Sequence, residues 1–211
     1  MGRYRGPQCR LCRAEKKKLF LKGERCYGPK CQVAKKKNPP GKGQRVRMKK
    51  LSDYGVQLRE KQKVKRTYGM YEKQFRIFFA RADRMSGKTG DNLIVLLERR
   101  LDNVVYRMRF SSSRKQARQL VSHGHVLVNG RKVNIPSYLV KESDVVEIAE
   151  NSKKMVVIKE SLKEYTKSGV SLWLEVDPDI IKGTIKALPA RKDIADLADV
   201  KEQLIVELYS K

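Results

Sequence analysis

The amino-acid sequence predicts an α+β fold, in which a mainly helical protein also contains a small antiparallel sheet. Apolar residues recur at helical spacing along one face of residues 91–108, which predicts an amphipathic helix. Two β-prone runs, 126–128 and 131–133, flank Asn129-Gly130, a pair typical of two-residue hairpin turns. With 211 residues, 40% of them hydrophobic, the chain can bury the core of one large domain or of two small ones.

Charge is distributed unevenly along the chain. There are 49 Lys and Arg against 23 Asp and Glu, a formal net charge of +26, with +16 in residues 1–50, +13 in 51–141 and −3 in 142–211. This excess predicts a polyanionic partner for the first two thirds of the chain, with nucleic acid as the leading candidate. The sequence has no run of 18 or more apolar residues and no apolar signal-peptide core after its first residues. We therefore expect a cytoplasmic protein without a membrane anchor.

All four cysteines lie near the start of the chain, as Cys9-x2-Cys12 and Cys26-x4-Cys31. Two such pairs can surround one tetrahedral ion, so the spacing predicts a structural zinc site. We expect each pair to lie on a short turn and the neighbouring basic residues to lower the thiol pKa values. Two disulfides, four free thiols and an iron–sulfur cluster are the alternatives. Four protein ligands leave no position open for a substrate, so the metal would hold a highly charged segment together and not catalyse a reaction.

The segments that follow the cysteines are strongly basic. Residues 34–43 are rich in Lys, Pro and Gly, which predicts an extended linker that lies on phosphates. From Ser52 to Arg66 the apolar residues Val56 and Val64 are sparse, which predicts a helix that touches the core along a narrow stripe. Few carboxylates in this segment balance its charge, so we expect its wide basic face to be available to RNA.

Residues 72–84 predict a second helix, whose rings Phe75, Phe78 and Phe79 belong to the core. The following Gly87-Lys88-Thr89 resembles part of a phosphate-binding loop. That motif requires a glycine five residues before Gly87, and Ala82 occupies the position, so we reject this interpretation.

A short basic helix is predicted after residue 113. Ser113 and Gln116 form a capping-box pattern that begins the helix, and Gly124 ends it. Arg114 and Arg118 lie one turn apart near the positive helix N-terminus, so we expect them to project together towards phosphate.

Beyond this helix the sequence predicts the hairpin already described and a further strand at 145–148. The two histidines, His123 and His125, have no other type of metal ligand clustered near them. We interpret them as partners of phosphate or of the backbone.

Several of these segments together resemble the S4 RNA-binding domain, which a number of protein families share: 100–107 (RLDNVVYR), 114–125 (RKQARQLVSHGH), 128–130 (VNG) and 136–138 (PSY). Outside that domain, three more segments are similar to bacterial small-subunit ribosomal protein S4: 3–7 (RYRGP), 53–63 (DYGVQLREKQK) and 202–210 (EQLIVELYS). The resemblance therefore runs nearly from end to end, and the four cysteines match the zinc-binding form of the family.

The resemblance implies a structural protein of the small ribosomal subunit without enzymatic activity. It implies binding to the five-way junction in the 5′ domain of 16S ribosomal RNA, where the family nucleates assembly, and an influence on translational accuracy. It also implies contact with ribosomal protein S5 and a place near the entry channel for messenger RNA. Repression of the protein's own messenger varies within the family.

The family fold also suggests a domain organisation. A zinc-binding basic arm and linker would occupy residues 1–45, and a helical domain would occupy 46–97, completed by 186–211. An RNA-binding domain would be inserted at 98–185, with its S4 motif at 98–148.

These considerations give a set of candidate site residues. We expect Cys9, Cys12, Cys26 and Cys31 to hold one Zn²⁺ ion. We expect RNA to be bound by the following basic and polar residues: Arg3, Arg5, Lys35, Lys36, Lys37, Arg45, Arg47, Lys49, Lys50, Tyr54, Gln57, Arg59, Lys61, Gln62, Lys65, Arg114, Lys115, Arg118, His123, His125, Asn129 and Arg131. Recognition should depend mainly on RNA shape and phosphates, because A-form grooves hide most base edges.

Two other classes of protein deserve comparison. RNA-modifying enzymes also carry the S4 domain, but residues 151–211 are too few for a catalytic domain and contain no nucleotide or metal motif. A DNA-binding zinc protein would need a recognition helix after its cysteines, and none with a known spacing follows.

Overall fold

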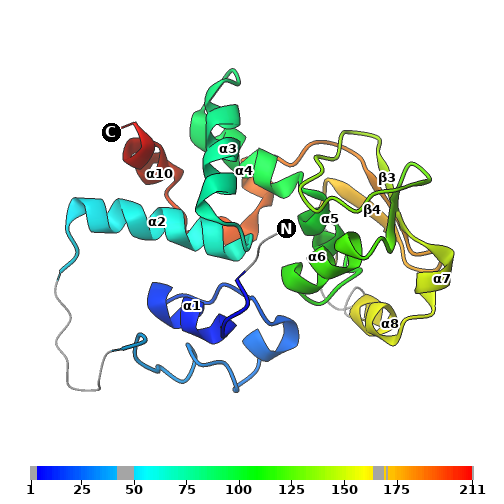
Figure 1. Cartoon of the computed structure of the whole chain (residues 1–211), viewed down its shortest axis with the longest axis horizontal. Coiled ribbons are helices and arrows are strands. Elements are labelled where there is room, and N and C mark those ends of the chain that lie inside the picture. The colour runs from blue at the N-terminus through cyan, green and yellow to red at the C-terminus, as the bar shows by residue number, and fades with distance from the viewer. Residues whose placement is uncertain (1–3, 42–49, 164–168, 170, 211) are drawn as a thin grey trace. The chain divides into compact units, whose positions relative to one another are not determined.

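The computed structural model describes residues 4–41, 50–163, 169 and 171–210 (Figure 1). The chain divides into two compact units. Unit 1 consists of Met1–Leu93 and Asp196–Lys211, and unit 2 consists of Ile94–Ala195. Unit 2 thus lies between two sequence segments that fold together.

Unit 1 is helical in its described part. Its helices are α1 (Gln8–Glu15), η1 (Gly23–Cys26), α2 (Asp53–Thr67), α3 (Glu72–Asp83), the first half of α4 (Thr89–Glu98), part of η3 (Ala195–Leu197) and α10 (Glu202–Tyr209). Helix α2 begins after Ser52, whose hydroxyl accepts a hydrogen bond from the Gly55 N–H at 3.2 Å and so caps the helix.

The core of unit 1 is formed where α2, α3 and α10 bury their apolar side chains. Val64, Phe75 and Ile205 are fully buried, and Phe78 nearly so. The half-buried Phe79 ring lies 4.5 Å from the Tyr209 ring between centroids. The prediction that the phenylalanines of α3 belong to the core is confirmed.

Unit 2 combines helices with a five-stranded antiparallel sheet, which confirms the α+β class. Its elements are the second half of α4, α5 (Leu101–Arg107), α6 (Arg114–Ser122), β1 (Val126–Val128), β2 (Arg131–Lys132), β3 (Val145–Ile148), α7 (Glu150–Lys153), α8 (Val156–Lys163), β4 (Leu174–Asp177), β5 (Lys182–Ile185) and η2 (Arg191–Asp193). The strand order is β2-β1-β3-β5-β4. In the central strand, β3, Val146 pairs with Val128 of β1 on one side and with Gly183 of β5 on the other.

The core of unit 2 lies between helices α5 and α6 and the sheet. It is formed by fully buried side chains, among them Leu101, Val104, Val105, Met108, Phe110, Val121, Val126, Val146 and Ile185. Gly183 on β5 faces Met108, and a Cβ there would lie 2.7 Å from the Met108 sulfur. Strand β5 can therefore approach α5 this closely because its residue is glycine.

The prediction of a single helix over 91–108 is wrong. Helix α4 ends at Glu98 and α5 begins at Leu101, and the intervening Arg100 is extended, with φ −66° and ψ 135°. Arg100 pairs with Leu139 as an isolated antiparallel bridge, and the Leu101 N–H donates to the Tyr138 carbonyl at 2.8 Å. These hydrogen bonds to a distant segment replace those that would have continued the helix.

The hairpin and the cap of α6 are confirmed. Asn129 and Gly130 have φ values of 49° and 74°, as a type I′ turn requires, and Val128 pairs with Arg131. The Ser113 hydroxyl accepts from the Gln116 N–H at 3.4 Å. The Gln116 side-chain oxygen accepts a hydrogen bond from the Ser112 N–H at 2.9 Å. In a regular capping box it would accept from the Ser113 N–H instead.

None of the helices in the described part of the chain is both long and apolar enough to cross a membrane.

Glu72 joins three helices of unit 1. Its carboxylate accepts hydrogen bonds from Lys61 and Lys65 of α2, at 2.7 and 2.8 Å, and from the Tyr209 hydroxyl of α10, at 2.8 Å. Burial alone would raise the pKa of this carboxyl, but the three donors outweigh burial and lower the pKa from 4.5 to about 2. The charged form of Glu72 therefore stabilises the packing of α2, α3 and α10.

This stabilisation should be complete above the ordinary pKa of 4.5 and should be lost as the pH falls from 4.5 towards 2. We expect Glu72→Gln to lower the urea midpoint of unit 1 near neutral pH. The variant should then lose less additional stability in acid than the unsubstituted chain. Circular dichroism during urea unfolding measures this, and fluorescence of the buried Trp173 separates the unfolding of unit 2. Glu24→Gln, at an exposed position, is the matched control. Equal acid sensitivity of Glu72→Gln and the unsubstituted chain would contradict the prediction.

Candidate nucleic-acid interface

The predicted RNA-binding residues before α2 fall into two groups, according to whether the structure describes them. Arg3, Arg45, Arg47 and Lys49 lie outside the described residues. The exposed ones that the structure describes are Arg5, Lys35, Lys36, Lys37 and Lys50. Lys35 and Lys36 lie in a turn, because their N–H groups donate to the carbonyls of Cys31 and Val33 at 3.0 and 2.9 Å. The prediction of an extended linker is therefore wrong for the first part of residues 34–43, where three consecutive ammonium groups are presented from a turn.

The cysteines are placed differently from the prediction. Cys9 and Cys12 lie on helix α1 and not on a short turn, whereas Cys26 ends η1 and Cys31 follows in a turn. Cys12, Cys26 and Cys31 are buried, and Cys9 is partly exposed. No disulfide joins any two of them.

The expected lowering of the thiol pKa values is also wrong for two of these groups. Burial raises the pKa of Cys12 and of Cys26, and the negative charges of neighbouring cysteines raise it further. Backbone N–H groups act in the opposite direction, including that of Lys22, which lies 3.4 Å from the Cys26 Sγ. Among the side chains that the structure describes, no three from His, Cys, Asp and Glu are arranged to hold a metal ion.

The basic face of α2 is largely occupied by contacts within unit 1. Lys61 and Lys65 bind Glu72, as described above. Gln57 donates to the Glu207 carboxylate of α10 at 3.0 Å and is buried. The expectation that the whole basic face is available to RNA is therefore wrong for Lys61 and Lys65, because a carboxylate of another helix, Glu72 of α3, balances them. Of the residues predicted to bind RNA here, Tyr54 stays 60% exposed and Gln62 is half-buried.

Glu15, at the end of α1, is another carboxylate that binds basic side chains of α2. Its side chain is fully buried and forms ion pairs with Arg66 and, at 3.3 Å, with Arg59, both of α2. Burial raises the pKa of Glu15, and the two guanidinium groups oppose that change. Arg59 thus holds the cysteine-containing helix against α2, whatever further contact it makes.

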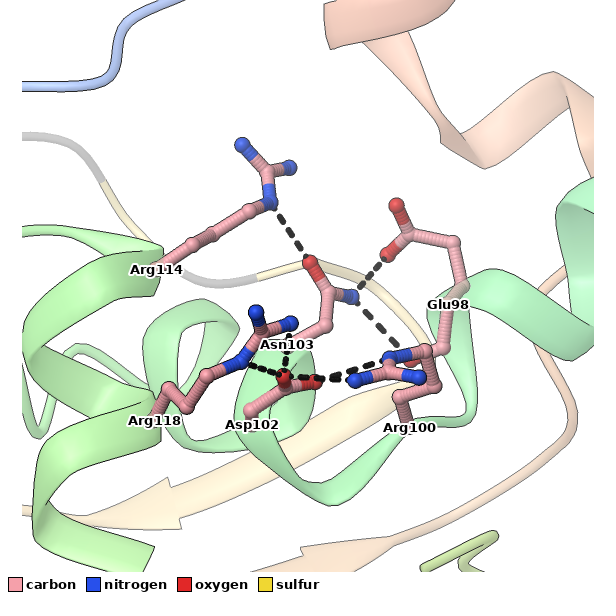
Figure 2. A network of polar contacts seen from close by, with 6 residues as sticks. All are labelled: Glu98, Arg100, Asp102, Asn103, Arg114 and Arg118. Atoms are coloured by element: carbon pink, nitrogen blue, oxygen red, sulfur yellow. Dashed lines mark hydrogen bonds and ion pairs between the residues drawn. The ribbon is translucent and has the colours of Figure 1, made fainter. Parts of the chain in front are cut away.

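A network of buried polar side chains in unit 2 is organised around Asp102, in the first turn of α5 (Figure 2). Arg100 is fully buried, and its Nε and Nη2 donate to the two carboxylate oxygens of Asp102 at 3.1 and 2.8 Å. Arg118 of α6 reaches the same carboxylate, with its Nε at 2.8 Å and its Nη2 at 2.6 Å from Oδ2. One carboxylate therefore joins α6 to the break between α4 and α5.

A second branch of the network begins at Glu98, whose side chain is fully buried (Figure 2). Glu98 accepts from Arg107 through two parallel bonds of 2.9 Å each and from the Asn103 amide nitrogen at 2.8 Å. The Asn103 amide oxygen in turn accepts from the Arg114 Nε at 2.8 Å. The Arg114 guanidinium lies over the Tyr106 ring, 4.5 Å from its centroid.

The expectation that Arg114 and Arg118 project freely from α6 is wrong. The two residues are 8% and 9% exposed, and both are held by acceptors on α5. Their neighbour Lys115 is exposed. On α6, two buried arginines held by α5 therefore lie beside one exposed lysine.

Of the two hairpin residues predicted to bind RNA, one has a structural role and the other is exposed. Asn129 donates to the Asp144 carboxylate at 2.8 Å and accepts from the Val145 N–H at 2.8 Å, so it ties the turn to β3. Arg131 is exposed at the start of β2. Asn129 therefore has a clear structural role, and Arg131 is presented to a partner.

The histidines lie at the end of α6, with ring centroids 6.0 Å apart. His123 is exposed, whereas His125 is half-buried and its Nδ1 lies 2.8 Å from the Ser152 hydroxyl. Gly124 between them has φ +73°, and the Lys132 side chain crosses it so closely that a Cβ would lie 2.0 Å from the Lys132 Cε. The positive φ favours glycine at this position, whereas the end of the exposed Lys132 side chain can move aside.

The sequence reasoning missed Glu98, Asp102 and Asn103, which organise the network. A signal for them was present, because Glu98 and Asp102 lie beside Arg99 and Arg100 between two apolar runs, 93–97 and 104–105. Charged residues in such a stretch are buried only when they are paired.

Comparison with known proteins identifies similar chains over the full length. The family model described as "Ribosomal protein S4/S9 N-terminal domain" matches residues 3–98, and the model described as "S4 domain" matches 99–146. The small ribosomal subunit protein uS4 of Geobacter sp. strain M21 is 58% identical over 211 residues, all of both chains. Proteins of the same name from Geotalea uraniireducens and Desulforapulum autotrophicum are 58% and 57% identical, also over the whole of both chains.

The network yields a prediction about stability. Asp102→Asn removes the charge that balances the buried Arg100, so we expect it to lower the free energy of unfolding of unit 2 by roughly 3–5 kcal/mol. Urea unfolding followed by Trp173 fluorescence measures the effect, since Trp173 belongs to the core of unit 2. Asp179→Asn, at an exposed position in the same unit, should change stability by less than about 0.5 kcal/mol. Similar losses in the two variants would show that Asp102 does not balance a buried charge.

Proposed function

The chain belongs to the ribosomal protein S4 family, and from this membership we propose that it is a structural protein of the small ribosomal subunit that binds 16S ribosomal RNA. The observation that carries the proposal is the full-length identity with proteins named small ribosomal subunit protein uS4. The net charge of +26 supports an RNA partner, because a polyanion offsets repulsion among the basic groups. Assembly into a ribosome would place the protein in the cytoplasm.

RNA binding in this proposal uses two kinds of cation. Exposed lysines and arginines can reach phosphates directly, such as Lys36 in a turn, Lys115 on α6 and Arg131 on β2. The arginines of α6 are instead held in fixed positions by α5. A combination of mobile and fixed cations suits recognition of RNA by its shape and its phosphates.

We further propose the finer roles that the family resemblance implies. The RNA site is the five-way junction of the 5′ domain, where binding nucleates assembly of the subunit and influences translational accuracy. Ribosomal protein S5 is the protein neighbour, and messenger RNA passes close by. The concentration of positive charge in residues 1–141 supports a large RNA contact in that part of the chain.

A structural role is favoured over an RNA-modifying activity. Enzymes that carry an S4 domain attach it to a separate catalytic body. The two family models cover 3–146, and the remaining residues contribute β4 and β5 to the sheet of unit 2 and α10 to unit 1. The C-terminal residues therefore complete the two units and do not form a body of their own.

For the four cysteines we propose one structural Zn²⁺ ion. Four sulfur donors of a two-plus-two spacing suit zinc, and three of them are buried. Backbone N–H groups at the sulfurs of Cys12 and Cys26 favour the thiolate form that a metal requires, and they oppose the larger effect of burial, which raises the pKa of both thiols. When bound, the ion would supply a tetrahedral cross-link between α1 and the segment after η1.

The RNA-binding surface can be tested through salt dependence. We expect Lys115→Ala and Arg131→Ala to weaken binding to a 16S 5′-domain RNA and to lower the slope of log K against log salt by roughly 0.7–0.9 for each lost phosphate contact. Filter binding at several salt concentrations measures both quantities. Lys159→Ala, at an exposed position on α8 in the acidic third of the chain, should leave both unchanged. Unchanged slopes in the first two variants would exclude these residues from the interface, and tighter binding to duplex DNA than to this RNA would refute the proposed function.

The zinc proposal has its own test. We expect the purified chain to contain about one zinc per molecule by elemental analysis, as four thiolate ligands imply. Replacing Cys9 and Cys12 with serine should abolish zinc binding and accelerate amide exchange in residues 4–41, while Trp173 fluorescence reports an intact unit 2. Slow exchange in the variant would show that the segment folds without the metal. Visible absorption with iron in place of zinc would indicate an iron–sulfur cluster.

A further inference from the structure

Helix α3 buries one side in the core of unit 1 and exposes the opposite side. Phe75, Phe78 and Ala82 are buried on the core side. At 3.6 residues per turn, the exposed residues opposite them fall within an arc of roughly 140° around the helix axis. We call this set the outer face of α3, and it consists of Lys73, Arg76, Ile77, Ala80, Arg81 and the C-cap residue Arg84.

Four of the six residues on the outer face are cations, and none is an acid. The acids of α3, Glu72 and Asp83, lie outside this arc and have other contacts. Glu72 binds Lys61 and Lys65 of α2. Asp83 accepts a hydrogen bond from the Thr89 hydroxyl at 3.3 Å. The outer face therefore carries a concentrated positive charge that the acids of its own helix do not offset.

Other parts of unit 1 neutralise little of this charge. The Arg76 Nε lies 3.8 Å from a carboxylate oxygen of Glu72, and 70% of the Arg76 side chain stays exposed. Among the described residues, no carboxylate lies within ion-pair distance of Lys73, Arg81 or Arg84. The outer face thus differs from the basic face of α2, where carboxylates of other helices bind the lysines.

Helix stability does not explain this arrangement of cations. Arg81 and Arg84 lie near the end of α3, where the helix dipole favours positive charge. Lys73 is the second residue of the helix, where the same dipole disfavours a cation. Like charges gathered on one face also repel one another, and a bound polyanion offsets that repulsion.

We propose that the outer face of α3 is an RNA contact, which binds the phosphate backbone of a helical RNA segment. This inference deepens the proposed function and rests on it, since it adds a surface of unit 1 that the sequence did not predict. From Lys73 to Arg84 the face is about 16 Å long, which spans several phosphates of one strand. The exposed Ala80 lies at its middle, and this short side chain lets the backbone approach the surrounding cations. Contacts of this kind read RNA shape and not base sequence.

A carboxylate placed at the middle of the outer face tests the inference. Ala80→Glu puts an acid four residues from both Arg76 and Arg84, a spacing that stabilises a helix. We expect the urea midpoint, followed by circular dichroism, to stay the same or to rise slightly. Affinity for a 16S 5′-domain RNA should fall about threefold or more, because the carboxylate repels phosphate and occupies the cations. Ala80→Gln has the same size without the charge and should bind the RNA as the unsubstituted chain does.

Removal of the cations is the second test. We expect Lys73→Ala and Arg84→Ala each to weaken binding and to lower the slope of log K against log salt by roughly 0.7–0.9 for each lost phosphate contact. Filter binding at several salt concentrations measures both quantities. Lys201→Ala is the matched control, because this exposed lysine precedes α10 in the same unit, and it should leave the slope unchanged.

Hydroxyl-radical footprinting of the RNA backbone separates a local contact from a general loss of structure. In the complex with the Ala80→Glu variant, we expect one group of protected nucleotides to become accessible while the others stay protected. Loss of all protections together, equal weakening by Ala80→Glu and Ala80→Gln, or unchanged salt slopes in Lys73→Ala and Arg84→Ala would each overturn the inference. The proposed function fails separately, if the unsubstituted chain binds duplex DNA more tightly than this RNA.

Discussion

The fold of this chain depends on the pairing of buried arginines with a small number of carboxylates. A buried guanidinium without an acceptor is strongly destabilising, so each arginine that enters the interior of so basic a chain requires one. In unit 2 the acceptors are Glu98 and Asp102, which lie on either side of the break between α4 and α5. Asp102 holds Arg100 in the break and Arg118 on α6, and so fixes α6 against α5. The position of α6 thus depends on one carboxylate.

Unit 1 follows the same rule with acceptors that are distant in sequence. Glu15 of α1 and Glu72 of α3 form ion pairs with cations of α2. Glu207 of α10 accepts a hydrogen bond from Gln57 of α2. Much of the charge on α2 therefore holds helices together. Among the residues that the structure describes, exposed cations such as Lys36, Lys115 and Arg131 remain available to a partner, and they form a narrower surface than the net charge suggests.

Features set by neighbouring residues could be predicted from the sequence. Ser113 caps α6 through a bond to the third residue after it, and Asn129-Gly130 adopts the turn that its own backbone preferences favour. The α+β class, the hairpin and strand β3 followed from such local signals. The resemblance to the S4 family supplied what local patterns could not.

Features set by distant residues were missed for a physical reason. The break at Arg100 depends on pairing with Leu139, and the burial of Arg114 depends on Asn103, neither of which hydrophobic periodicity reports. Strands β4 and β5 were not predicted because Gly183 and the turn before it weaken the strand pattern. The same glycine leaves the space that the Met108 side chain occupies.

The network around Asp102 also means that charges in this protein differ in how much the fold depends on them. A designer who wanted a less basic chain, for instance to reduce adhesion to cellular nucleic acid during purification, could exchange exposed lysines such as Lys35 or Lys159 at small cost to the fold. Neutralising an acid that an interior arginine depends on, such as Asp102, would instead raise the net charge by one and would also undo a helix junction. The interior carboxylates are therefore harder to replace than the exposed lysines.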